Sequence, residues 1–183
     1  MTSTMRLRRA AVAERLLSAS PQAAAVLDWD ALDRVPAWLA LADAAFATFQ
    51  CRVGAVLCSR VLRLWIDRRR LAAAQAALGA PFLCALLAER DSDSIPLGLF
   101  ACPEIDSPLR VEPMLRLAGA SVLLATLPDG VPRDAIGALL APATASCMAP
   151  ELALALVARA ESLDAPASAQ AASRGAAPEG AAS

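Results

Sequence analysis

The longest periodic pattern of apolar and polar residues runs from residue 46 to residue 89. At 100° per residue on a helix, one line of the surface collects only apolar side chains, namely Phe46, Val53, Leu57, Leu64, Leu71 and Leu78. Phe49, Val56 and Val61 widen this line into a stripe that is typical of a helix packed on a core. Because Leu62 and Ile66 fall on the opposite side, we expect a central helix that is covered on two faces.

The ends of this pattern predict a long helix followed by a hairpin. Proline at residue 36 suits a first helical turn, so one helix or two should fill residues 36–78, with Gly54 as the weakest point. Gly79 should end this segment as a C-cap glycine. A second helix at 81–90 should then fold back on the first.

The rest of the chain predicts shorter helices, an irregular connection and a tail. Helices are expected at 5–18, 21–27, 113–127, 134–140 and 150–162, of which 113–127 is apolar nearly all round and should be buried. The connection 91–113 contains four prolines, with 95–102 as a candidate extended segment. The last residues are mostly Ala, Ser, Pro and Gly and include no large apolar side chain, so they should not order. We therefore predict an all-α protein with a single irregular helical domain at 1–163, built around the long central helix and the hairpin, and a disordered tail at 164–183.

Composition argues for a cytoplasmic protein without nucleic-acid partners. The 183 residues suit one domain, and the net charge of −1 predicts no general affinity for nucleic acid. No charge-free apolar run reaches the roughly 20 residues that a spanning helix needs. Glu14 and Arg15 interrupt any apolar signal core near the N-terminus. We expect no direct membrane insertion, and we expect the basic helix at 5–18 to dock on the core.

Several kinds of catalysis are excluded because the residues are missing. The chain has no histidine and all 17 basic residues are arginine, which removes Ser-His-Asp and Cys-His catalysis, most catalytic zinc sites and Schiff-base lysines. The odd number of cysteines at irregular spacing predicts free thiols. We therefore expect no enzyme, no cofactor and no metal site. A small metal- or carboxylate-dependent enzyme, using the acids of the connection 91–113, is the remaining catalytic hypothesis.

Charge is unevenly placed and indicates a candidate partner-binding surface. Residues 52–70 carry six arginines against one aspartate, a balance of +5, and residues 91–112 carry five acids against one arginine, a balance of −4. On the expected long helix, Arg52, Arg63 and Arg70 share one face and Trp65 lies at the edge of the core stripe. These four residues are our candidate site for an acidic partner protein. The alternative is that the arginines pair internally with the acidic connection.

Three stretches carry a resemblance to a known family. They are Trp38, then Leu64-Trp65-Ile66-Asp67 with the arginines after it, and Leu78-Gly79-Ala80-Pro81-Phe82. Over residues 25–127 the chain resembles the small cytoplasmic accessory proteins of bacterial type III secretion systems, the SctK (YscK-like) proteins and their counterpart from the hrpB operon.

The resemblance implies a non-enzymatic adaptor of the cytoplasmic sorting platform. Such a protein would link the cytoplasmic domain of the inner-membrane ring to a pod protein of the SctQ type. It would be cytoplasmic and held at the cytoplasmic face of the inner membrane through these partners. The alternative is a helical regulator or a chaperone-like protein-binding module unrelated to secretion.

Overall fold

The computed structural model describes residues 3–19, 32, 35–89, 105–127, 136–137, 139–140 and 148–175. Within these ranges the chain forms helices and no strand, which confirms the predicted all-α fold. The elements are α1 (Ser3–Ala19), η2 (Ala37–Ala40), α3 (Asp43–Leu57), α4 (Ser59–Arg63), α5 (Arg68–Leu78), α6 (Ala80–Ala88), η3 (Pro108–Arg110), α7 (Val111–Ala125) and α9 (Pro150–Gly175).

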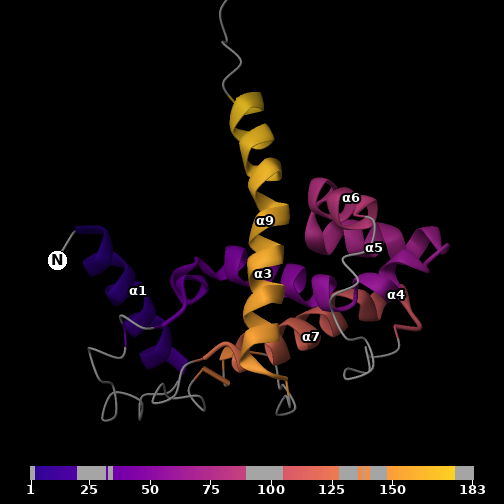
Figure 1. Ribbon diagram of the computed structural model, residues 1–183. Coiled ribbons are helices and arrows are strands. Elements are labelled where there is room, and N and C mark those ends of the chain that lie inside the picture. The colour runs from indigo at the N-terminus through magenta and orange to yellow at the C-terminus, as the bar shows by residue number, and fades with distance from the viewer. Residues whose placement is uncertain are drawn as a thin grey trace, which may run out of the picture.

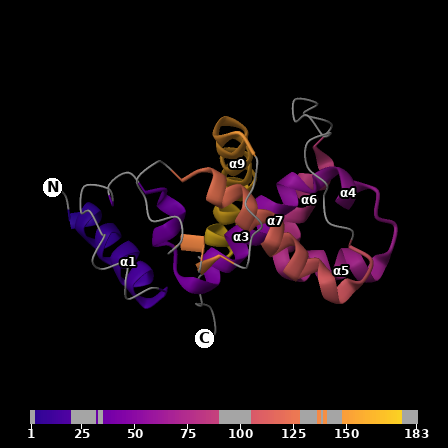
Figure 2. The ribbon, with the colours of Figure 1, turned by 90° about the horizontal axis from the view of Figure 1, so that it is seen from below.

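Helices α3 and α7 pack side by side at the centre of the molecule, and α9 crosses both of them (Figure 1). Helix α1 lies at one end of the molecule, and α4, α5 and α6 lie at the other end (Figure 2). The buried apolar residues of all these segments form one continuous core. The predicted burial of the helix near 113–127 is confirmed, because Leu115, Val122 and Leu123 of α7 are fully buried.

Two glycines set the close approach of α3 and α7. A Cβ atom added to Gly54 would lie 1.9 Å from the carbonyl oxygen of Leu115, and one added to Gly119 would lie 1.9 Å from that of Gln50. Both distances are far below van der Waals contact, so only glycine fits at either position. Gly54, predicted as the weakest point of a long helix, is therefore a packing position inside α3.

The predicted long central helix is broken into three α-helices. Helix α3 ends at Leu57, α4 is only five residues long, and residues 64–67 connect α4 to α5. The side chain of Asp67 accepts a hydrogen bond of 2.8 Å from the backbone N–H of Arg69. This N-cap starts a new helix at Arg68, where the hydrophobic pattern alone had predicted a continuous one.

The breaks shift the phase of the predicted core stripe. Val53 and Leu78 are fully buried as predicted, but Leu64 is 74% exposed, so its prediction as a core residue was wrong. The pattern also predicted that Leu62 and Ile66 lie on a second covered face: Leu62 is fully buried, but Ile66 is 95% exposed, so its prediction was wrong. A line drawn at 100° per residue follows one face only while the helix is continuous. The breaks after Leu57 and Arg63 therefore remove its meaning for residues 64–67.

The predicted hairpin is confirmed. Gly79 ends α5 with a φ of 85°, a left-handed conformation that favours glycine, and α6 begins directly after it. The axes of α5 and α6 are bent by 116°. Among the described residues no single helix is long and apolar enough to cross a membrane, although α5 and α6 together pass that test by length and composition.

The terminal helices differ from prediction mainly in length. The docking of α1 on the core is confirmed, since Val12 and Leu16 are buried. Helix α9 begins at Pro150 as predicted but continues to Gly175, so its predicted end near residue 162 was wrong. Asp164 also forms an ion pair with Arg52. The expected elements at 21–27 and 95–102 lie outside the described residues, as does part of 134–140.

The cysteines differ in their state. Cys51 is a buried free thiol, as predicted, and burial together with the nearby Glu112 carboxylate raises its pKa to about 11. Cys84 is free and exposed. Cys58 takes part in a disulfide, so the prediction of free thiols was wrong there. Its partner lies outside the described residues, and sequence spacing does not reveal a bridge between segments that only folding brings together.

Candidate protein-interaction surfaces

The three arginines of the predicted surface do not share a helix face, because they belong to α3, α4 and α5. Arg52 holds α3 against its neighbours. Its Nε donates a 3.1 Å hydrogen bond to the carbonyl of Leu78, and its guanidinium lies 5.2 Å from the centre of the Phe82 ring. It also forms the ion pair with Asp164. Arg52 therefore connects α3 to the hairpin and to α9.

Arg63 and Arg70 also make contacts within the fold. Arg63 donates a 3.2 Å hydrogen bond to the carbonyl of Leu86, which ties α4 to α6. Arg70 donates a 3.0 Å hydrogen bond to the backbone carbonyl of Asp106 and lies 3.4 Å from the carboxylate of Asp67. The contact with Asp106 joins α5 to the end of the acidic connection. The alignment of these arginines in one row was a wrong prediction, since it required an unbroken helix.

The connection between α4 and α5 presents apolar side chains to solvent. Leu64 is 74% exposed and Ile66 is 95% exposed, whereas Trp65 between them is partly buried against the core. The connection is held at both sides, because the amides of Leu64 and Trp65 donate to carbonyls of α4 and Asp67 caps α5. We call this feature the α4–α5 tip, defined as residues 60–70. It lies at the end of the molecule opposite α1 (Figure 2).

The exposed charges of the α4–α5 tip are positive. Arg60, Arg68 and Arg69 are exposed, and none of them forms an ion pair with a described residue. The only acid of the tip, Asp67, is already engaged in the cap and in the contact with Arg70. Of the four predicted site residues, Trp65 and Arg70 therefore belong to an exposed basic and apolar surface. Arg63 lies at its inner edge, and Arg52 is elsewhere.

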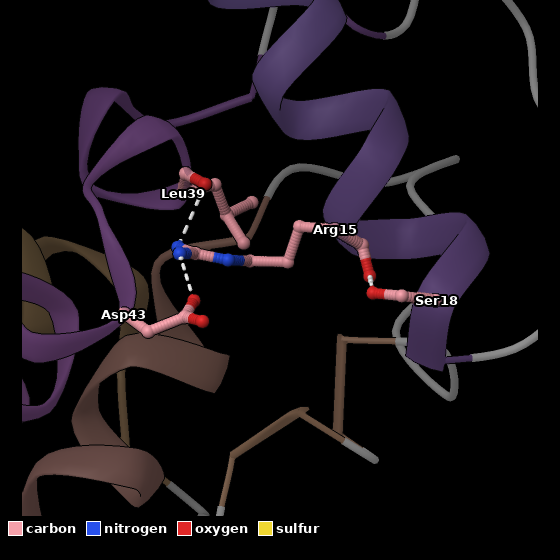
Figure 3. Close-up of polar contacts among 4 residues, drawn as sticks. All are labelled: Arg15, Ser18, Leu39 and Asp43. Carbon is pink, nitrogen blue, oxygen red and sulfur yellow. Dashed lines mark hydrogen bonds and ion pairs between the residues drawn. The ribbon is translucent and has the colours of Figure 1, made fainter.

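A second surface lies at the other end of the molecule, where Arg15 fixes α1 to the body. Its guanidinium donates hydrogen bonds to the carbonyl of Leu39 at 3.0 Å and to Asp43 at 2.7 Å, as Figure 3 shows. The same group lies 4.7 Å from the centre of the Phe46 ring. Ser18 donates a 2.9 Å hydrogen bond back to the carbonyl of Arg15. In the sequence, Arg15 stands out only as a charge that interrupts an apolar run.

The outward side of α1 has a regular pattern. Leu7, Ala10, Glu14 and Leu17 are all exposed and follow one another at spacings of three, four and three residues, so they lie along one face. Leu7 is 70% exposed and Leu17 is 39% exposed. A groove of about 640 Å³ runs beside this helix, between α1 and residues 40–43.

Two further grooves lie against the body. One of about 550 Å³ lies between α3 and α9, with Trp38 and Phe49 in its wall, and one of about 730 Å³ lies between α5 and the start of α7. The buried polar atoms that have no hydrogen-bond partner among the described residues include the indole N–H of Trp38 and the side-chain oxygen of Gln50. The other end of the Gln50 amide donates to the carbonyl of Arg116 at 2.8 Å.

Within the described ranges, no three His, Cys, Asp or Glu side chains gather closely enough to hold a metal ion. In comparisons with known proteins, the chain matches no family model, no curated protein and no solved structure.

Proposed function

We propose that this chain is a non-enzymatic adaptor of a bacterial type III secretion apparatus. In this role it links the cytoplasmic domain of the inner-membrane ring to a pod protein of the SctQ type. It works in the cytoplasm, at the inner face of the inner membrane. The proposal takes its context from the resemblance carried by Trp38, residues 64–67 and residues 78–82.

The observation that carries the proposal is the outward face of α1. A helix that places apolar side chains on one exposed line suits the groove of a protein partner. Leu7 and Leu17 are ten residues apart, which is about 15 Å along the helix, and Glu14 lies between them on the same face. This is the length of contact that an amphipathic helix makes in a hydrophobic groove.

The inner side of α1 explains how this face is held in place. Arg15 contacts Leu39, Asp43 and Phe46, and Arg8 donates a hydrogen bond to the carbonyl of Val35. These contacts fix the direction of α1 before a partner arrives, so little conformational entropy is lost on binding. A preformed, exposed helix at the end of a molecule is what a linking protein needs.

The test is capture of purified partners by the full-length chain. We expect the wild type to bind the ring's cytoplasmic domain and the pod protein. Leu7→Ser with Leu17→Ser should weaken one of the two by roughly 100-fold, because a buried leucine contributes about 1.5–3 kcal/mol. Leu154→Ser is the matched control, since Leu154 is 54% exposed on α9. It should leave both interactions unchanged.

Two results would count against the proposal. If the α1 variant binds both partners as tightly as the wild type, the outward face of α1 is not the docking surface. If the wild type binds neither partner, the alternative of a helical regulator or chaperone-like module outside secretion takes its place. Thermal melting of each variant shows whether a lost interaction reflects a lost fold.

A further inference from the structure

We propose that the α4–α5 tip docks on an anionic lipid surface. In this contact Leu64 and Ile66 enter the boundary between headgroups and acyl chains, and Arg60, Arg68 and Arg69 face the lipid phosphates. The inference goes beyond the proposed function and does not depend on it, since α1 and the tip lie at opposite ends of the molecule (Figure 2).

The shape of the tip favours a fluid surface over a protein pocket. Leu64 and Ile66 project from a short connection whose two sides are fixed by α4 and by the Asp67 cap. Neither residue lines any of the three grooves described above. An apolar projection of this kind needs a partner that closes around it, and a bilayer does so without a matching hollow.

The charge of the tip complements anionic lipid. Residues 60–70 contain five arginines and one aspartate, a balance of +4. The whole chain has a net charge of −1, so the remainder carries −1 − 4 = −5. The positive charge of the tip therefore favours the approach of these residues to an anionic surface.

Trp65 fits the same environment. Its side chain is partly buried against the core between the two exposed apolar residues. Tryptophan is enriched at membrane–water interfaces, where one side of the ring is apolar and the other is hydrated. The contact is peripheral and involves a few side chains, as in proteins that lie on a membrane without spanning it.

The experiment is flotation of the full-length chain with lipid vesicles. We expect binding to vesicles of phosphatidylethanolamine with phosphatidylglycerol, weakening as salt is raised, and no binding to phosphatidylcholine alone. Leu64→Ser with Ile66→Ser should weaken binding by on the order of 100-fold. Arg68→Gln with Arg69→Gln should weaken it by roughly 30-fold at low salt. Leu154→Ser, which removes an exposed leucine elsewhere, should bind like the wild type.

Three outcomes would overturn the inference. The first is a folded wild type that does not bind the anionic vesicles. The second is binding that persists when Leu64 and Ile66 are both serine. The third is a wild type that does not bind lipid, together with tip variants that no longer capture the ring or pod protein. This result would make the tip a protein-docking surface. The α1 variant separates this test from the proposed function, since it should lose a protein partner and keep vesicle binding.

Discussion

Replacing Gly54 with alanine tests the contact between α3 and α7 most directly. In an ordinary helix interior this change stabilises by about 0.5–1 kcal/mol, because alanine restricts the unfolded chain. Here the added Cβ would lie 1.9 Å from the Leu115 carbonyl oxygen and 2.8 Å from the Gly119 nitrogen. Both neighbours are backbone atoms of α7, so neither can rotate away.

The expected cost follows from how far the helices must separate. Ordinary van der Waals contact begins at 3.4 Å, so α3 and α7 would have to move apart by about 1.5 Å, and a gap of 0.5–1 Å already forfeits a quarter to a half of a dispersion contact. Val53, Val56, Leu115 and Val122 are fully buried on these two helices. At about 1.5–3 kcal/mol each, their partial loss outweighs the gain in helix propensity. We expect a net destabilisation of about 3 kcal/mol.

The assay is equilibrium urea unfolding of the wild type and three variants. Gly54→Ala and Gly119→Ala should each lower the midpoint, and the double variant should cost less than the sum, because the first change already separates the helices. Gly137→Ala is the control, since no atom of the described residues lies within 4 Å of its added Cβ. A Gly54→Ala protein as stable as the Gly137→Ala protein would refute the glycine contact.

Three further predictions concern stability. Leu64→Ala should lower the free energy of unfolding by less than about 0.5 kcal/mol, because the side chain is 74% exposed. Leu62→Ala should lower it by about 2–5 kcal/mol, because Leu62 is fully buried. The denaturant midpoints of the two variants test this difference. The free energy of unfolding should fall by about 2–3 kcal/mol between about pH 9 and 11. The raised pKa of Cys51 keeps its thiol protonated in the native state, whereas the unfolded thiol ionises in this range. In the Cys51→Ala variant, the free energy of unfolding should change less with pH. Asp164→Asn should cost about 1 kcal/mol, since it removes the charge that faces the partly buried guanidinium of Arg52; an unchanged melting temperature would show that this pair contributes nothing.

The features that sequence predicts well are those encoded by neighbouring residues. Gly79 ends one helix and permits the next because its own backbone conformation requires it. Pro150 begins α9 for a similar local reason. The apolar pattern near 113–127 indicates a buried helix without reference to any other segment. Each of these conclusions depends on a few adjacent residues, and each is confirmed.

The features that sequence predicts poorly depend on distant partners. Gly54 looked like a weak point because a glycine lowers helix propensity, but its importance comes from Gly119, 65 residues further along the chain. The break before α5 was hidden because the apolar pattern runs through residues 64–67 and does not show that Asp67 is an N-cap. Because that break was missed, Leu64 was placed in the core, although Leu78 beyond the break is buried as the pattern predicts.

The same dependence explains the candidate site. Arg52, Arg63 and Arg70 aligned in one row only because the helix was assumed to be continuous. The sequence nevertheless indicated the connection between α4 and α5, since Leu64 and Ile66 stand beside Asp67. An aspartate directly before the first residue of a helix is a cap signal. Had it been used, residues 64–66 would have been placed in a connection, and two large apolar residues in a connection suggest an exposed contact.

The internal use of arginine carries a consequence for recognition. Arg52 and Arg63 donate part-buried hydrogen bonds to backbone carbonyls of α5 and α6. A guanidinium that satisfies a buried carbonyl cannot turn outward without leaving that acceptor unpaired, at a cost of about 1–3 kcal/mol. A partner that engaged these two groups fully would therefore work against the fold. The exposed apolar side chains of Leu64, Ile66, Leu7 and Leu17 make no hydrogen bonds that a partner would have to break, so burying them on a partner gains free energy at both ends of the molecule.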